Sequence, residues 1–325
     1  MRRITWAAAA IAAATLWSAA CGRARPAPTV IRVGYSGESD FSDLPSLLAQ
    51  ARLRAQGFQI ESAFFSGTSV AVAEVSRGTV DILNGSMIGV WMAISRGAAV
   101  RTIMNHTADP YRFVAGRGIE ACAALDGRRV GLATDSSVST HLVRAYLTDE
   151  CPSASPEVLT IGESSNRVAA FLAGGIDAAG LELSSWLWLQ KQAPGRYVLL
   201  SDFSKRWPAI KTTGVHVNTG FARAHRDLVE EYVRAVLAAN RDVLADPSLL
   251  VAAANEHMGR SEDWTATARA YIDAAAWSPR GGLTRQDVES TLAFFQAHSR
   301  LETHLTADDV ADLGFLDKAL ADTHE

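Results

Sequence analysis

The chain has 325 residues, with 31 Lys and Arg against 35 Asp and Glu, which gives a formal net charge of −4 at pH 7. This mild negative balance, without a block of Lys and Arg, argues against nucleic acid as a partner. The length is enough for two lobes, each with a hydrophobic core of its own.

The first 21 residues have the pattern of an export signal, because two arginines precede an apolar run that ends in small residues. The run is too short and too rich in Ala for a confident membrane span. Ala19-Ala20-Cys21 resembles the lipobox of bacterial lipoproteins, although Ser18 stands where Leu is usual. We therefore expect either a lipid anchor on Cys21, which would hold a soluble body at a membrane surface, or ordinary cleavage after Ala20. Residues 22–29 are predicted to be a short tether.

From Ile31 onward, short apolar runs alternate with amphipathic segments, which is typical of βαβ units on a parallel sheet. Strands are predicted at 31–36, 58–65, 81–84, 100–104, 128–132 and 198–200, and helices at 43–57, 88–96, 135–147 and 186–192. Segments 111–116 and 213–218 are predicted to cross between the lobes. The first lobe would then comprise residues 30–115 and 217–325, with a helical C-terminal part, and the second lobe residues 116–216.

The chain contains one stretch twice, at 63–86 and again at 160–184. Gly78-Thr79-Val80-Asp81 aligns with Gly174-Gly175-Ile176-Asp177, and upstream Arg32-Val33-Gly34 aligns with Arg129-Val130-Gly131. The repeat predicts a two-lobed α/β fold, with a mostly parallel sheet flanked by helices in each lobe and a ligand cleft between the lobes. Ligands of parallel sheets lie beyond the carboxyl ends of the strands, near the helix N-termini.

Polar residues follow the predicted strands at that edge and are our candidate ligand contacts. In the first lobe they are hydroxyls and backbone N–H groups, which favour an anionic or strongly accepting group: Ser36, Ser66, Thr68, Ser69, Gly85 and Ser86. In the second lobe they include two carboxylates, which suit an amine, amide or ring N–H: Ser136, Ser137, Thr140, Glu163, Ser164, Asn166 and Glu182. We therefore expect a dipolar solute, with its anionic or carbonyl end in the first lobe and its donor end in the second.

Each of these residues also has a purely structural interpretation. A hydroxyl at a helix start can simply cap the helix, and Glu182 can form a salt bridge to a nearby Arg such as Arg167. Trp186 could stack on a ring of the solute, although helical aromatic residues usually belong to the core.

Apart from Cys21, the chain has only Cys122 and Cys151. In an oxidising compartment such a pair forms a disulfide more often than a metal site, and two buried free thiols are the alternative. The histidines have no metal-binding spacing, so we expect no metal and no cofactor. Nucleophile-elbow, phosphate-loop and zinc-protease motifs do not occur in the sequence, which argues against an enzyme.

Taken in order, the motifs resemble those of the periplasmic substrate-binding proteins of ABC importers, especially the group for taurine, other sulfonates, nitrate and thiamine-precursor pyrimidines. The matching segments are 32–35, 78–82, 125–131, 174–178 and 277–284. The resemblance implies a monomer at the outer face of the cytoplasmic membrane or in the periplasm. It implies that the lobes close on one small solute by hinges near Gly116 and Val215 and deliver it to a permease.

The segment 52–58 departs from the pattern of that group, which leaves the identity of the solute open. A ligand sensor or surface interaction protein of the same fold, without transport, is an alternative. A related pyrimidine synthase is a more distant one, since the chain lacks the cysteine-rich stretch and reactive Lys-His pair that it would require.

Overall fold

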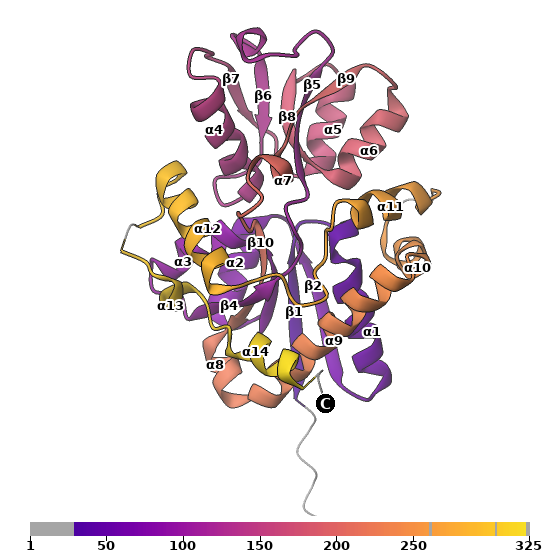
Figure 1. Cartoon of the computed structure of the whole chain (residues 1–325), viewed down its shortest axis with the longest axis vertical. Coiled ribbons are helices and arrows are strands. Elements are labelled where there is room, and N and C mark those ends of the chain that lie inside the picture. The colour runs from indigo at the N-terminus through magenta and orange to yellow at the C-terminus, as the bar shows by residue number, and fades with distance from the viewer. Residues whose placement is uncertain (1–28, 260–261, 303, 323–325) are drawn as a thin grey trace, which may run out of the picture.

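The structure, a computed structural model, describes residues 29–259, 262–302 and 304–322. The predicted signal segment, Cys21 and residues 22–28 of the predicted tether lie outside these ranges. The described chain forms two α/β lobes, one above the other in Figure 1, each built on a five-stranded sheet flanked by helices. The predicted fold class is confirmed. No helix within the described ranges is both long and apolar enough to span a bilayer.

The first lobe, the lower one in Figure 1, draws on both ends of the described chain. Its strands are β1 (Val30–Ser36), β2 (Gln59–Phe65), β3 (Ile82–Ser86), β4 (Val100–Asn105) and β10 (Thr213–Asn218). Its N-terminal helices are η1 (Phe41–Asp43), α1 (Leu44–Ala55), α2 (Thr68–Arg77) and α3 (Met87–Ile94). Its C-terminal helices are α8 (Thr219–Ala224), α9 (Arg226–Ala245), α10 (Ser248–His257), α11 (Thr265–Asp273), α12 (Arg285–His298), α13 (Ala307–Val310) and α14 (Gly314–Ala321).

The second lobe is continuous in sequence. Its strands are β5 (Tyr111–Gly116), β6 (Arg129–Leu132), β7 (Glu157–Thr160), β8 (Ala178–Glu182) and β9 (Tyr197–Asp202). Its helices are η2 (Cys122–Leu125), α4 (Val138–Glu150), α5 (Ser164–Leu172), α6 (Leu183–Gln192) and α7 (Phe203–Arg206). The C-terminal helices of the first lobe also contact the second lobe, because α11 contacts α6 and α12 contacts α4 across the lobe boundary.

The two sheets have the same strand arrangement, as the sequence repeat indicated. The orders are β2-β1-β3-β10-β4 and β7-β6-β8-β5-β9. In each sheet the first three strands are parallel, and the fourth runs antiparallel to both of its neighbours. The succession β1-α1-β2-α2-β3 therefore corresponds to β6-α4-β7-α5-β8.

Both predicted crossings are wrong in position, and with them the predicted lobe boundaries. Segment 111–116 is strand β5 of the second sheet, and segment 213–218 is strand β10 of the first. The links between the lobes are 106–110 and 207–212, so the second lobe spans 111–206. Gly116 and Val215 lie in hydrogen-bonded ladders and are unsuited to be hinges. The apolar pattern led us to predict connectors at these positions, because a buried connector and an inserted antiparallel strand have similar sequence patterns.

The residues that carry the repeat form the same ion pair in each lobe. Arg32 donates from its backbone N and from Nε to Asp81 Oδ2, at 2.8 and 3.0 Å. Arg129 does the same to Asp177 Oδ2, at 2.9 and 3.1 Å. Both pairs join the N-terminal parts of neighbouring parallel strands, so this half of the motif holds the sheet together and does not face a ligand.

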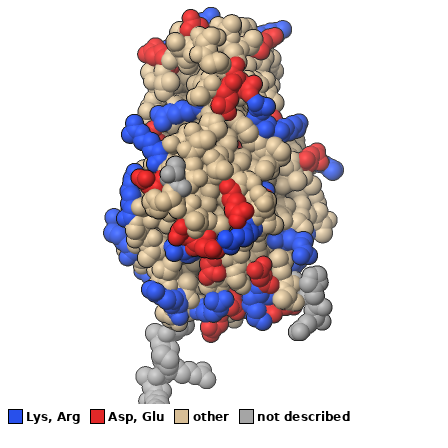
Figure 2. Space-filling view, turned by 60° about the vertical axis from the view of Figure 1, so that its left-hand side comes forward, with Lys and Arg blue, Asp and Glu red and all other residues tan. Residues whose placement is uncertain are grey.

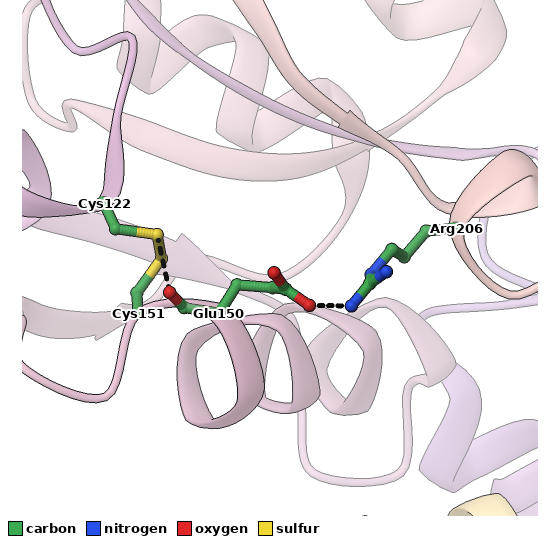
Figure 3. Close-up of a disulfide and its surroundings, with 4 residues drawn as sticks. All are labelled: Cys122, Glu150, Cys151 and Arg206. Carbon is green, nitrogen blue, oxygen red and sulfur yellow. Dashed lines mark hydrogen bonds and ion pairs between the residues drawn. A yellow bond between two sulfur atoms is a disulfide. The ribbon is translucent and has the colours of Figure 1, made fainter.

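Cys122 and Cys151 are joined by a disulfide, with their Cα atoms 5.0 Å apart. The bond ties the start of η2 to the residue that ends α4 (Figure 3). Beside it, Glu150 on the last turn of α4 forms an ion pair with Arg206 of α7. The end of α4 is therefore fixed on two sides of the second lobe.

Asp109 lies in the first link between the lobes and is only 6% exposed. Its Oδ1 accepts a hydrogen bond from the Tyr111 N–H at 2.8 Å, while Oδ2 has no partner among the described residues. Burial raises the pKa of Asp109 from its ordinary 3.8 to about 7. The folded protein therefore keeps a proton at pH values where the unfolded chain has already lost it.

We expect the free energy of unfolding to fall as the pH rises from about 4 to about 7, by up to about 1.4 kcal/mol per pH unit, because of this carboxyl group. Asp109→Asn cannot ionise and should flatten that slope and stabilise the protein at pH 8. Urea unfolding at pH 5 and pH 8 measures both effects, with the exposed Asp227→Asn as the control. Equal slopes for Asp109→Asn and wild type would contradict the prediction.

Candidate functional site

A cavity of about 130 Å³ lies between the lobes and is lined by residues of both. It is located at the carboxyl ends of the strands, where Ser36 ends β1, Ser86 ends β3 and Glu182 ends β8. For scale, an engineered protein cavity of about 150 Å³ admits benzene. The cavity therefore has room for a solute of about that size in the conformation that the structure shows.

Helix N-termini converge on the cavity, since the first residues of α2, α3, α4, α5 and α6 or their caps line it. The Ser86 hydroxyl caps α3 by accepting the Gly89 N–H at 3.2 Å. Glu163 and Glu182 stand at the N-cap positions of α5 and α6, but their side chains make no capping bond. The positive ends of these helices favour carboxylates here, and the carboxylates remain available to a ligand.

Most of the candidate contacts from both lobes meet at this cavity. The lining includes Ser36, Thr68, Gly85, Ser86, Ser137, Glu163, Ser164 and Glu182. These positions follow the strand-end rule, which depends only on chain direction in a parallel sheet.

Six other candidates do not line the cavity. Ser69 and Ser136 bond each other across the lobe boundary, with their Oγ atoms 2.7 Å apart. Thr140 is buried inside α4. Ser66 and Asn166 are exposed, and Trp186 lines a separate groove near α7.

The most unusual feature of the cavity is a pair of carboxyl groups, one from each lobe. Asp40 follows β1, and its carboxylate accepts bonds from Ser184 Oγ at 2.5 Å and Tyr271 Oη at 3.1 Å. Glu182 accepts a bond from Tyr111 Oη at 3.2 Å. Burial, then the charge of Asp40 and a hydrogen bond with it, raise the pKa of Glu182 well above its usual range.

A second carboxylate of the first lobe, Asp43, also lines the cavity and lies 2.9 Å from His106 Nε2. Burial raises the pKa of Asp43, and the hydrogen bond with His106 opposes this increase. The sequence interpretation placed only hydroxyls and N–H groups in the first lobe. That expected division between the lobes is wrong, because Asp40 and Asp43 make this wall acidic as well.

Arg167 is the buried cation of the cavity wall and is 2% exposed. It donates to the carbonyl oxygens of Gly162 and Gly180 and, from Nη2 at 2.9 Å, to Ser164 Oγ. Burial lowers the pKa of Arg167, while the nearby charge of Glu182 favours its protonated form. The guanidinium therefore bonds mainly to backbone and hydroxyl oxygens, and not to Glu182 as a simple salt-bridge interpretation would have it.

The lobes are closed onto the cavity. Glu163 of the second lobe lies against two loops of the first, since a Cβ atom on Gly37 would come within 2.8 Å of its Oε2. The Ser86 hydroxyl donates to the Ser136 carbonyl oxygen at 3.0 Å across the same boundary. At the rim, Lys191 of α6 pairs with Glu262 at 2.8 Å, and His298 of α12 with Asp149 of α4 at 3.0 Å.

Sequence reasoning missed several groups at the cavity, namely Glu38, Ser39, Asp40, Asp43, His106, Tyr111 and Arg167. A signal existed for the first of them, because residues 38–40 follow the first strand directly. These residues were not among our candidate contacts, and the Asp40 side chain also caps η1. The tertiary structure alone brings His106 and Tyr111 here, from both ends of the first link.

The charge of the cavity differs from that of the outer surface. Five carboxyl groups line it, those of Glu38, Asp40, Asp43, Glu163 and Glu182, against one guanidinium and one imidazole. On the face shown in Figure 2, by contrast, positive and negative side chains are intermingled. Among the described residues, no three His, Cys, Asp or Glu side chains are grouped in a way that could hold a metal ion.

Two α/β lobes closed over a polar cavity define the class of two-lobed periplasmic solute-binding folds. The fold is similar to that of the alkanesulfonate-binding protein SsuA from Xanthomonas axonopodis pv. citri bound to MOPS, with 18% identity, a TM-score of 0.70, and coverage of 87% of this chain and 98% of that one. It is also similar to a zinc-bound ligand-binding component of an ABC-type import system from Staphylococcus aureus. The identity is 14%, the TM-score is 0.72, and the match covers 89% of this chain and 98% of that one. The fold is similar, too, to that of the periplasmic nitrate-binding protein NrtA from Synechocystis PCC 6803. Here the identity is 9%, the TM-score is 0.67, and the match covers 91% of this chain and 89% of that one.

A sequence profile of the NMT1/THI5 like family matches residues 49–249, and the chain belongs to this family. Among curated proteins, none matches this chain in sequence. The resemblance drawn from the sequence motifs is confirmed for the family and for the fold.

Proposed function

We propose that this chain is an exported solute-binding protein, which captures one small organic solute between its lobes and delivers it to an ABC permease. It works as a monomer, without a cofactor and without catalysing a reaction. It resides in the periplasm or, with a lipid on Cys21, at the outer face of the cytoplasmic membrane.

The observation that supports this proposal is the cavity itself. It is small, polar and walled by both lobes, so a solute in it would contact both and favour the closed state. The lobes can rotate about the two connecting segments, 106–110 and 207–212. A solute held with a Kd on the order of 1 μM requires about 8 kcal/mol, which a few buried hydrogen bonds and a desolvated ring or chain can supply.

The relatives include proteins whose names state sulfonate or nitrate binding. The acidic lining of this cavity supports a different preference, a solute that donates hydrogen bonds, such as an amino-substituted pyrimidine. A dipolar solute remains compatible, provided that its anionic end lies near Arg167.

Native mass spectrometry of the chain from Pro28 onward, before and after unfolding and refolding, tests solute capture. We expect a small mass to be lost on refolding and to be regained when the recovered solute is added back. Delivery is tested separately, by deleting the gene and measuring cellular uptake of that solute. Normal uptake in the deletion strain would contradict transport and favour a sensor or interaction protein of the same fold.

A further inference from the structure

The wall of the cavity contains buried polar atoms that have no hydrogen-bond partner among the described residues. Asn84 is 2% exposed and lines the cavity. Its Nδ2 donates to Tyr232 Oη at 3.2 Å, which leaves Oδ1 without a partner among the described residues. Buried polar atoms without a partner destabilise a protein unless a ligand or water satisfies them. An unsatisfied carbonyl oxygen calls for a hydrogen-bond donor in the cavity.

The carboxyl pair points to the same ligand chemistry from the other side. Asp40 of the first lobe and Glu182 of the second face each other, and three hydroxyls already donate to them. Two adjacent, half-buried carboxyl groups do not both ionise readily, because their charges repel each other. Burial and the neighbouring Asp40 raise the pKa of Glu182, and a cation placed between the two carboxyl groups would favour the ionised form of Glu182.

We propose, on the basis of the solute-binding function above, that Asp40 and Glu182 together hold a positively charged nitrogen of the solute, which displaces the proton of Glu182. The solute is therefore an organic cation, with an ammonium or amidinium group, and not a simple sulfonate or nitrate. The exchange is balanced: the cation enters, the O–H bond of Glu182 breaks, and one proton leaves to solvent.

The groups around Glu182 are compatible with this exchange. Asp40 and Asp43 face it from the segment of η1, Arg167 from α5, Tyr111 from β5 and Tyr271 from α11. Arg167 is the one guanidinium of the lining, and its donors already bond to two carbonyl oxygens and a hydroxyl. It therefore does not neutralise the carboxyl pair fully. A metal ion is a poor alternative occupant, because the described residues offer no cluster of metal-ligand side chains.

The test uses matched probes that differ in one group: aminomethyl, hydroxymethyl and sulfonate derivatives of ethane, benzene and pyrimidine, together with nitrate. Isothermal titration calorimetry at pH 5 to 8, in buffers of different ionisation enthalpy, gives the affinity and the number of protons released. We expect the amines to bind at least about 30-fold more tightly than their partners, with affinity rising with pH and close to one proton released at the acidic end.

Asp40→Asn and Glu182→Gln should each weaken amine binding by about 30-fold or more, because they leave a buried cation with half of its counter-charge. Both variants remove repulsion between carboxylates, so they should fold, which circular dichroism checks. Glu61→Gln on the exposed face of β2 is the matched control and should bind like wild type.

Two results would overturn the cation proposal and leave solute capture intact. One is tighter binding of a sulfonate or of nitrate than of the amines, and the other is amine binding that changes neither with pH nor with either substitution. A protein that carries no small mass and binds no probe would overturn both proposals.

Discussion

Replacing Arg167 by Met is expected to lower the free energy of unfolding by about 3–5 kcal/mol, the usual effect of removing one partner from a buried charged network. The guanidinium is almost fully buried and donates to the carbonyl oxygens of Gly162 and Gly180 and to Ser164 Oγ. Met fills similar space but donates nothing, so each of these three acceptors loses a hydrogen bond. Glu163 and Glu182 also lose the one positive charge that favours their ionised forms.

Urea unfolding at pH 7, followed by circular dichroism, measures this loss. Arg128→Met removes the same charge from an exposed position just before β6 and should change the free energy of unfolding by less than about 0.5 kcal/mol. Equal effects of the two substitutions would show that the Arg167 network adds little to stability. Arg167→Lys should recover only part of the loss, because an ammonium group cannot reproduce the planar set of donors.

Removing the disulfide by the double substitution Cys122→Ala and Cys151→Ala is expected to have an effect of similar size. The bond closes a loop with a sequence separation of 29, for which loop-closure entropy predicts about 3.5 kcal/mol of stabilisation. The melting temperature should fall by roughly 10 °C. Differential scanning calorimetry with and without a reducing agent provides the measurement.

The reducing agent serves as the internal control for that experiment. Wild type should lose stability on reduction, whereas the double variant should not respond to it. If reduction left the wild-type melting temperature unchanged, the bond would contribute nothing to stability in solution. The Glu150–Arg206 ion pair beside the disulfide would then be the main restraint on the end of α4.

Much of the fold could be predicted from the sequence because its signals are local. The repeated Arg-Val-Gly and Gly-x-x-Asp segments recur for a physical reason, since each Arg–Asp pair joins two neighbouring parallel strands in its own lobe. Apolar periodicity located strands β1, β2, β3, β4, β6 and β9 and helices α1, α3, α4 and α6 within a few residues. It failed at β5 and β10, where the choice between a connector and an inserted strand depends on partners about 60 to 135 residues away.

The candidate site also has features that could be predicted from the sequence and features that could not. Chain direction in a parallel sheet decides which loops face the cleft, so the positions of Ser36, Ser86 and Glu182 could be read from the sequence. The negative charge of the cavity lining could not be predicted from the sequence. It arises when Asp40 and Glu182, which are 142 positions apart in the sequence, come face to face as the lobes close.

The sequence by itself determined the two α/β halves and the edge of the sheets that faces the cleft, because the alternation of strands and helices is encoded within each unit of the repeat. Only the tertiary structure decided the positions of the links, the buried state of Arg167 and the raised pKa of Glu182. Those properties depend on burial and on the distance between charges from different segments, which exist only after the two lobes have packed together.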